Sequence, residues 1–307
     1  MNGMKTNFFL ILLFVFFANA FSQSDTIIRN DTVIVFVKDT EPSEVVEFYL
    51  SGNFDAAKTA FENDNSYINR AKYKEFYLHS IIESSDTTRV LEFINKNFGI
   101  YPYLWMIKDE DIKNIVGIEY VNDYAKRTKE KFIKEYPNIN FDYFVALTHA
   151  EYRTSFFRNI YPDYFNDEAK ANDIFKRQHI LDSLNVLSLD TLLKRYGVPT
   201  KENVLEFGVS SFFLCVQHFD KDNLCRYKKY ITQIYKNNDM RPVDYAMYID
   251  RYLVYKGKKQ LYATQLTRNE NGELEFYPIK NKTKVDKRRK EMGFDESAND
   301  YLRNFSH

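Results

Sequence analysis

The residues whose types could carry acid–base chemistry lie in the second half of the chain, at two places. The apolar run Phe207–Val216 is followed directly by the polar residues Gln217, His218 and Asp220, and Asp250 stands farther along. A histidine at the carboxyl end of a buried helix faces the negative end of the helix dipole, and a nearby carboxylate also favours its charged form. Such a histidine suits proton transfer, so we predict His218 and Asp250 as catalytic residues of an acid–base hydrolysis.

Side chains that would bind the substrate lie in the same segments. Arg251 follows Asp250, and in a predicted strand from Lys259 to Thr267 the polar residues alternate so that every second one shares a face. A guanidinium or an amide is suited to hold an anionic group. We predict as substrate-binding residues Gln217, Asp220, Arg251, Gln260, Tyr262, Thr264 and Gln265.

The same residues also fit a role in folding alone. Gln217 and His218 can bond the free carbonyl groups at the end of their helix, and Asp250 can pair with Arg251 at a corner of the chain. Helix ends need such partners whether or not catalysis takes place. The sequence leaves both roles open, and convergence of these side chains around one pocket is the structural test.

Other common sites are missing from the sequence. No two of the 9 glycines are closer than Gly197 and Gly208, whereas dinucleotide fingerprints and P-loops need glycines at most about five positions apart. The five histidines are far apart and there are only two cysteines, so no zinc-ligand spacing forms. We predict no metal and no cofactor. With 43 basic and 43 acidic side chains the net charge is zero, which excludes a nucleic-acid binder that relies on bulk positive charge.

A basic segment and two cysteines each allow two interpretations. The segment from Lys280 to Lys290 is compatible with a phosphate-binding patch, but we expect a solvated surface because the net charge supplies no supporting field. Cys215 and Cys225 can pair in an oxidising compartment, or Cys215 can be a small buried core residue.

Helices dominate the elements that must position these residues. Glycine and proline are scarce, at 9 and 7 of 307 residues, which favours helices over a many-turned β-sandwich. Between residues 42 and 61 we expect an ordinary helical hairpin, although its turn resembles that of a tetratricopeptide-like helix pair. Apolar periodicity and helix stop signals predict further helices at 71–83, 87–97, 118–135, 141–160, 174–195, 202–218, 223–236 and 242–250.

Near the end of the chain the period changes from helical to alternating. Strands are predicted at Tyr252–Lys256, Lys259–Thr267 and Glu273–Ile279, with Gly257 and the Asn-Gly signal near 271 as turns. They would form a small antiparallel β-meander. The predicted fold class is therefore α+β and predominantly α-helical, with a β-meander near the C-terminus.

The first residues have the three parts of a secretory signal peptide. Lys5 precedes an apolar run of about ten residues, Phe8–Phe17, and small residues at Ala18 and Ala20 favour cleavage before Phe21, with a cut after Gln23 as the alternative. We expect no membrane span in the mature chain, because no later segment approaches the required apolar length. The predicted organisation is a signal peptide at 1–20, an extended lead-in or short strand within 21–41, a helical region at 42–140 and a further domain at 141–307.

Several short motifs in the second half occur in an order that resembles the bacterial domain of unknown function 6624 family. They begin with Tyr196-Gly197-Val198-Pro199-Thr200, continue through the polar groups at 216–220 and 250–254 and the segment Gly257–Gln265, and end with Val285-Asp286-Lys287-Arg288-Arg289 and Gly293. The resemblance covers roughly Phe141 to Leu302. The family pattern tends to have Trp in place of Val198 and Gly in place of Ala263. The family name implies no activity.

From these features we expect an exported, periplasmic or secreted bacterial protein that acts as a cell-envelope binding or interaction module. Its partner would be a small molecule or an envelope protein, and not a nucleic acid. The alternative is a hydrolase-like enzyme centred on His218.

Overall fold

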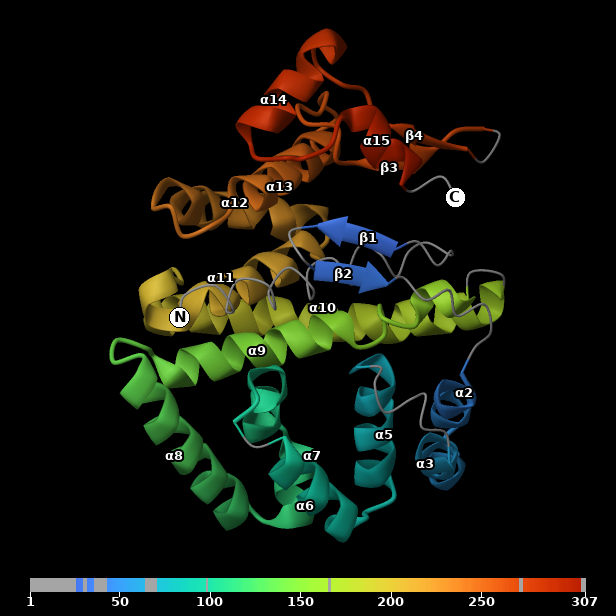
Figure 1. The fold of residues 1–307 in the computed structure, drawn as a ribbon, viewed down its shortest axis with the longest axis vertical. Helices are drawn as coiled ribbons and strands as arrows, with labels where there is room; N and C mark the ends of the chain where they lie inside the picture. The colour runs from blue at the N-terminus through green and yellow to red at the C-terminus, as the bar shows by residue number, and fades with distance from the viewer. Residues whose placement is uncertain are drawn as a thin grey trace. The chain divides into compact units, whose positions relative to one another are not determined.

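The computed structural model describes residues 26–29, 32–35, 43–63, 71–97, 99–164, 167–270 and 273–304. The predicted signal peptide at 1–20 lies outside these residues. The described chain is predominantly helical with a small antiparallel sheet near the C-terminus, so the predicted fold class is confirmed (Figure 1).

The chain divides into two compact units, and the division falls within a long helix, α10 (Glu168–Tyr196). The helical unit comprises residues 39–181 with 202–204, and the C-terminal unit comprises residues 182–201 and 205–307 together with the first 38 residues. Each unit is described by itself below.

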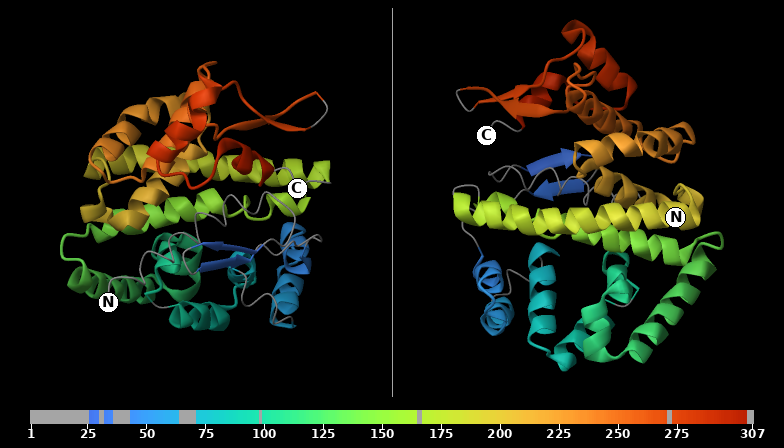
Figure 2. Two further views of the ribbon diagram at one scale, coloured as in Figure 1. Left: turned by 45° about the horizontal axis from the view of Figure 1, so that its top comes forward. Right: turned by 180° about the vertical axis from the view of Figure 1, so that it is seen from behind.

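The helical unit is built from helices and short 3₁₀ turns in sequence order. Its elements are α2 (Glu44–Leu50), α3 (Phe54–Asn63), α5 (Ala71–Glu83), α6 (Thr87–Lys96), η1 (Tyr101–Lys108), α7 (Glu110–Val116), α8 (Ile118–Glu135), α9 (Phe141–Ser155), η2 (Tyr161–Tyr164) and the first part of α10. Helix α9 runs across the ends of α5 and α8 (Figures 1 and 2). The predicted hairpin at 42–61 is present as the packed pair α2 and α3.

Local sequence signals explain several helix starts in this unit. Asp86, Asp109 and Asn140 each cap a helix, because their side-chain oxygens accept a hydrogen bond from a backbone amide of the first turn. Helix α9 is buried on nearly all sides, and Tyr143, Phe144 and Leu147 of its first turns are almost completely enclosed. It is therefore the central element of the unit.

The C-terminal unit combines long helices with a β-hairpin and short helices at its end. Its elements are the second part of α10, α11 (Lys201–Gln217), α12 (Lys221–Lys236), α13 (Pro242–Tyr255), β3 (Leu266–Arg268), β4 (Leu274–Phe276), η3 (Lys282–Lys284), α14 (Val285–Glu291) and α15 (Ala298–Arg303). Helices α12 and α13 pack side by side (Figure 1). Pro242 occupies the first turn of α13, as predicted, because a proline there loses no helical hydrogen bond.

The apolar run of α11 forms the core of this unit. Phe212, Phe213 and Val216 are at most 2% exposed, which confirms the predicted buried helix. Cys215 is a buried free thiol and Cys225 a half-buried one. The helix is not uniform, because Leu205 has φ 59° and ψ 170°, a conformation that a side chain rarely adopts.

The predicted β-meander is smaller in the structure. Residues Tyr252–Tyr255 are the last turn of α13, so the first predicted strand is wrong. Gln260–Gln265 form an irregular loop, in which Gln260 makes an isolated parallel bridge to Ile279, and Leu266–Arg268 pairs with Leu274–Phe276 as an antiparallel hairpin. A second hairpin joins β1 (Thr26–Arg29) and β2 (Thr32–Val35), so the β-branched run after residue 31 is a strand.

Candidate functional site

The predicted site residues surround the loop Gln260–Gln265, which we call the central loop. Asp250, near the end of α13, is fully buried and bonds this loop through both carboxylate oxygens. Its Oδ1 accepts hydrogen bonds from the amides of Leu261 (2.7 Å) and Tyr262 (3.1 Å). Its Oδ2 accepts from the amides of Tyr262 (3.0 Å) and Thr264 (3.1 Å) and from the Thr264 hydroxyl (3.1 Å).

These hydrogen bonds decide what Asp250 can do chemically. Burial raises the pKa of its carboxyl, while the bonds from Leu261, Tyr262 and Thr264 act in the opposite direction. Both oxygens are already acceptors for the loop, so abstraction of a substrate proton would break bonds that hold the loop. The geometry gives Asp250 a scaffold role.

Gln260 holds the central loop from within. Its side chain is fully buried, and Oε1 accepts from the amides of Thr264 and Gln265, both at 2.9 Å. Its Nε2 donates to the carbonyls of Gln265 (2.9 Å) and Tyr277 (2.8 Å). All four side-chain hydrogen bonds of this amide are made, so Gln260 has none left for a substrate.

Two arginines of α14 hold the loop from its other side. Arg288 Nε donates to the Leu261 carbonyl (2.7 Å), and Arg289 Nη1 donates to the carbonyls of Tyr262 (2.9 Å) and Ala263 (3.3 Å). Arg289 is fully buried, and its guanidinium lies 4.2 Å from the Phe294 ring centroid. The expectation that the basic segment is a solvated surface is wrong for Arg289, whereas Lys282, Lys284 and Lys287 are exposed.

Ala263 occupies a strained position in the loop. Its φ is 54°, in the left-handed region where a side chain costs conformational energy, and the residue is fully buried. Glycine adopts this conformation without that cost. The difference from the family pattern at this position therefore concerns backbone conformation.

Arg251 links the central loop to the end of α11. Its Nε donates to Gln265 Oε1 (3.0 Å), and its Nη1 donates to the Gln217 carbonyl. Gln265 in turn donates from Nε2 to the Thr264 hydroxyl (3.1 Å). The predicted residues Gln217, Asp250, Arg251, Gln260, Tyr262, Thr264 and Gln265 thus form one connected hydrogen-bond network, in which Tyr262 takes part through its backbone.

Gln217 differs from the other members of this network. Its side chain is 6% exposed, and Nε2 is buried with no hydrogen-bond partner. A buried amide donor without a partner costs free energy unless a ligand or water accepts from it. The backbone carbonyl of the same residue, Gln217, accepts a hydrogen bond from Arg251. The positively charged Arg251 and the unpaired Gln217 amide thus belong to the same part of the network, where α11 meets α13.

His218 and Asp220 lie at the other side of this corner. His218 is half-buried, and its amide donates to the Cys215 carbonyl (3.0 Å). Asp220 caps α12 by accepting from the amides of Asp222 (2.9 Å) and Asn223 (3.0 Å). Burial acts to raise the pKa of Asp220, but these hydrogen bonds outweigh it and hold the pKa below its usual range. Asp220 thus has a structural role of its own.

Several buried polar residues of the same unit were not predicted from the sequence. Asp182 and Asn185 on α10 and Ser210 and Ser211 on α11 are all at most 9% exposed. The signal for the first pair was their spacing of three within an apolar helical pattern, which places both on one inward face. Among the described residues, no group of three or more His, Cys, Asp or Glu is placed to hold a metal ion.

The structure is thus that of a predominantly helical protein whose central loop is held by buried polar side chains. The chain belongs to the family of unknown function DUF6624, which matches residues 146–306 and confirms the resemblance in the second half. No curated protein and no solved structure matches the chain. None of the helices that the structure describes is long and apolar enough to cross a membrane.

Proposed function

We propose that this protein is exported and acts as a binding module of the cell envelope, and that it holds an acidic group at the corner formed by Gln217 and Arg251. One observation carries the binding role: the Gln217 Nε2 donor is buried without a partner, in the residue whose backbone carbonyl accepts from the guanidinium of Arg251. A carboxylate or phosphate oxygen accepts from both groups, and a charged acceptor strengthens such bonds.

The same network supports binding rather than hydrolysis. An acid–base mechanism requires a carboxylate that is free to exchange a proton with the substrate or with a histidine. Asp250 already accepts five hydrogen bonds from three residues of the central loop. Gln260 likewise makes its bonds within the protein, so the family motif builds a rigid support for the corner.

Replacing Gln217 separates binding from folding. In the Gln217→Leu variant we expect succinate and inorganic phosphate to bind at least about tenfold more weakly than to the original protein, while the melting temperature stays equal or rises. The physical reason is that the variant removes a donor that the fold leaves unpaired. Isothermal titration calorimetry and thermal unfolding measure the two effects.

The control for that experiment is Lys282→Gln, which removes an exposed positive charge of the basic segment. It should leave the affinity for both anions unchanged. If Lys282→Gln weakens binding and Gln217→Leu does not, the basic segment is the anion site and the proposed corner is not.

Export has its own test. Expression of the complete chain in a Gram-negative host, followed by mass spectrometry of the periplasmic fraction, should give a mature protein that begins at Phe21 or, by the alternative cut, at Ser24. The apolar run and small residues near Ala20 support this outcome. A Lys5→Glu, Leu12→Arg double variant should stay in the cytoplasm at full length. Full-length original protein in the cytoplasm would contradict the proposal of export.

A further inference from the structure

The helical unit contains a second polar group that the family motifs do not include. Glu75 and His79 lie one turn apart on α5, Tyr103 and Trp105 lie on η1, and Tyr152 lies on α9. We call these five residues the acid–aromatic cluster. All precede the central loop by more than a hundred positions and belong to the other compact unit.

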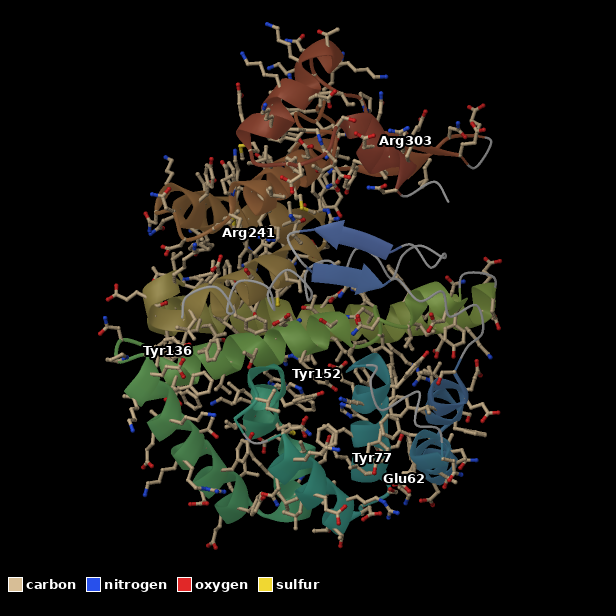
Figure 3. All side chains as sticks on the ribbon, in the orientation of Figure 1. Glu62, Tyr77, Tyr136, Tyr152, Arg241 and Arg303 are labelled. Atoms are coloured by element: carbon tan, nitrogen blue, oxygen red, sulfur yellow. The ribbon has the colours of Figure 1, made fainter. Side chains whose placement is uncertain are left out.

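Three rings of the cluster, those of His79, Trp105 and Tyr152, are arranged in near-parallel planes. Trp105 and Tyr152 stack with centroids 3.8 Å apart and an interplanar angle of 6°. The His79 ring is parallel to both within 4°, and its Nε2 is hydrogen-bonded to the Tyr152 hydroxyl. Figure 3 shows Tyr152 on the side of α9 that faces the helices below it. The cluster therefore contains three near-parallel rings whose positions are fixed by contact.

Two polar atoms of the cluster have no partner. Glu75 Oε2 and Trp105 Nε1 are both buried without a hydrogen bond, and Trp105 is fully buried as a residue. Glu75 and His79 are nevertheless only half-buried, so each keeps a part of its surface open. A carboxyl oxygen and an indole N–H left unpaired in one cluster together call for a ligand that offers both a positive donor and an oxygen acceptor.

The charges around Glu75 are negative or neutral. Burial, together with the neighbouring carboxyl of Glu151, raises the pKa of Glu75 to about 8. Burial lowers the pKa of His79 to about 4, so its imidazole is neutral at pH 7. Glu75 also helps to raise the pKa values of Tyr103 and Tyr152, which places both hydroxyls near its carboxyl. Two carboxyls and several aromatic rings thus share one buried region.

We propose that the acid–aromatic cluster binds the ammonium group of a small organic cation that also carries an oxygen atom. The ammonium group would lie against the aromatic rings and beside the unpaired Glu75 carboxyl, since ring faces and a carboxylate both attract a cation. The oxygen would accept from the Trp105 N–H. An anion is disfavoured in the ionised cluster because the Glu75 carboxylate repels it.

Choline is a suitable probe because its quaternary nitrogen keeps its charge at every pH and its hydroxyl supplies the acceptor. Trp105 is the only tryptophan of the chain, so fluorescence excited selectively at tryptophan, and not at the tyrosines, reports on this cluster. We expect choline to change the fluorescence in a saturable way. Its neutral isostere, 3,3-dimethylbutan-1-ol, should bind at least about tenfold more weakly, and tetramethylammonium should lie between the two.

The variant Glu75→Gln keeps the side-chain shape and removes the charge. It should bind choline at least about tenfold more weakly than the original protein, whereas Glu130→Gln, which removes an exposed carboxyl on α8, should bind normally. Choline affinity of the original protein should rise by tens of fold from pH 6 to pH 8, because binding requires Glu75 to lose its proton. Glu75→Gln should lose most of this dependence.

Three results would overturn the proposal. Equal affinity for choline and its neutral isostere would show that the rings bind methyl groups without regard to charge. Normal binding by Glu75→Gln would place the cation elsewhere. No saturable fluorescence change at millimolar choline at pH 8.5, in a protein that unfolds cooperatively, would mean that the cluster has no such ligand.

Discussion

Replacing Asp250 with alanine should lower the free energy of unfolding by about 3–5 kcal/mol, because the change leaves buried donors of Leu261, Tyr262 and Thr264 without an acceptor. Each unpaired buried donor costs about 1–3 kcal/mol, and relaxation of the loop recovers part of the sum. Urea unfolding followed by far-ultraviolet circular dichroism measures the loss.

Two further variants serve as comparisons for Asp250→Ala. Asp250→Asn keeps one acceptor oxygen and should lose roughly half as much free energy of unfolding as Asp250→Ala. Asp220→Ala removes only the cap of α12 and should cost about 1 kcal/mol. An Asp250→Ala protein as stable as the original would mean that the central loop does not depend on this carboxylate, and the scaffold role would be wrong.

Replacing Glu75 with glutamine should stabilise the protein at alkaline pH. The folded state raises the pKa of Glu75 from 4.5 to about 8, so the folded protein keeps a proton that the unfolded chain releases. Because the pKa is higher in the folded state, protonated Glu75 contributes to the free energy of unfolding. This contribution is full below pH 4.5 and is lost as the pH rises toward 8. The advantage of Glu75→Gln over the original protein should therefore be small at pH 5 and reach about 2–4 kcal/mol at pH 9.

Thermal unfolding of both proteins between pH 5 and pH 9 gives this comparison directly. Glu130→Gln is the matched control, because its carboxyl is exposed and should give no pH-dependent difference. A constant difference between Glu75→Gln and the original protein across the whole range would show that Glu75 titrates normally. It would also remove the predicted rise of choline affinity between pH 6 and pH 8.

Much of the fold follows from local patterns, and the exceptions have physical causes. Helix α5 spans the predicted 71–83, and α8 the predicted 118–135, because apolar periodicity and stop signals agree there. The segment Tyr252–Tyr255 looked like a strand because its residues are aromatic or apolar. Gly257, with φ 67°, follows the end of α13 directly. Glycine is common both just after the end of a helix and in the turn of a β-hairpin. The local sequence does not distinguish these two roles.

Most of the residues predicted for the candidate site belong to one hydrogen-bond network, but the bonds that each of them makes were not predictable. The motif order led to Asp250, Arg251 and Gln260, and the structure joins them in one network. Their hydrogen bonds run mainly to backbone groups of the central loop, which a sequence does not display. Arg289 was assigned to the surface because its neighbours are charged, although it lies four positions after the buried Val285 on one helix face.

In the central loop, some residues are needed for their side chains and others only for their backbone groups. Leu261 and Tyr262 serve the loop through their amides and carbonyls, which every amino acid except proline supplies. Their half-buried side chains are not part of the clamp. Evolution can therefore alter the chemical character of this surface between related proteins while the support beneath it stays the same, so one scaffold can present different surfaces to different partners.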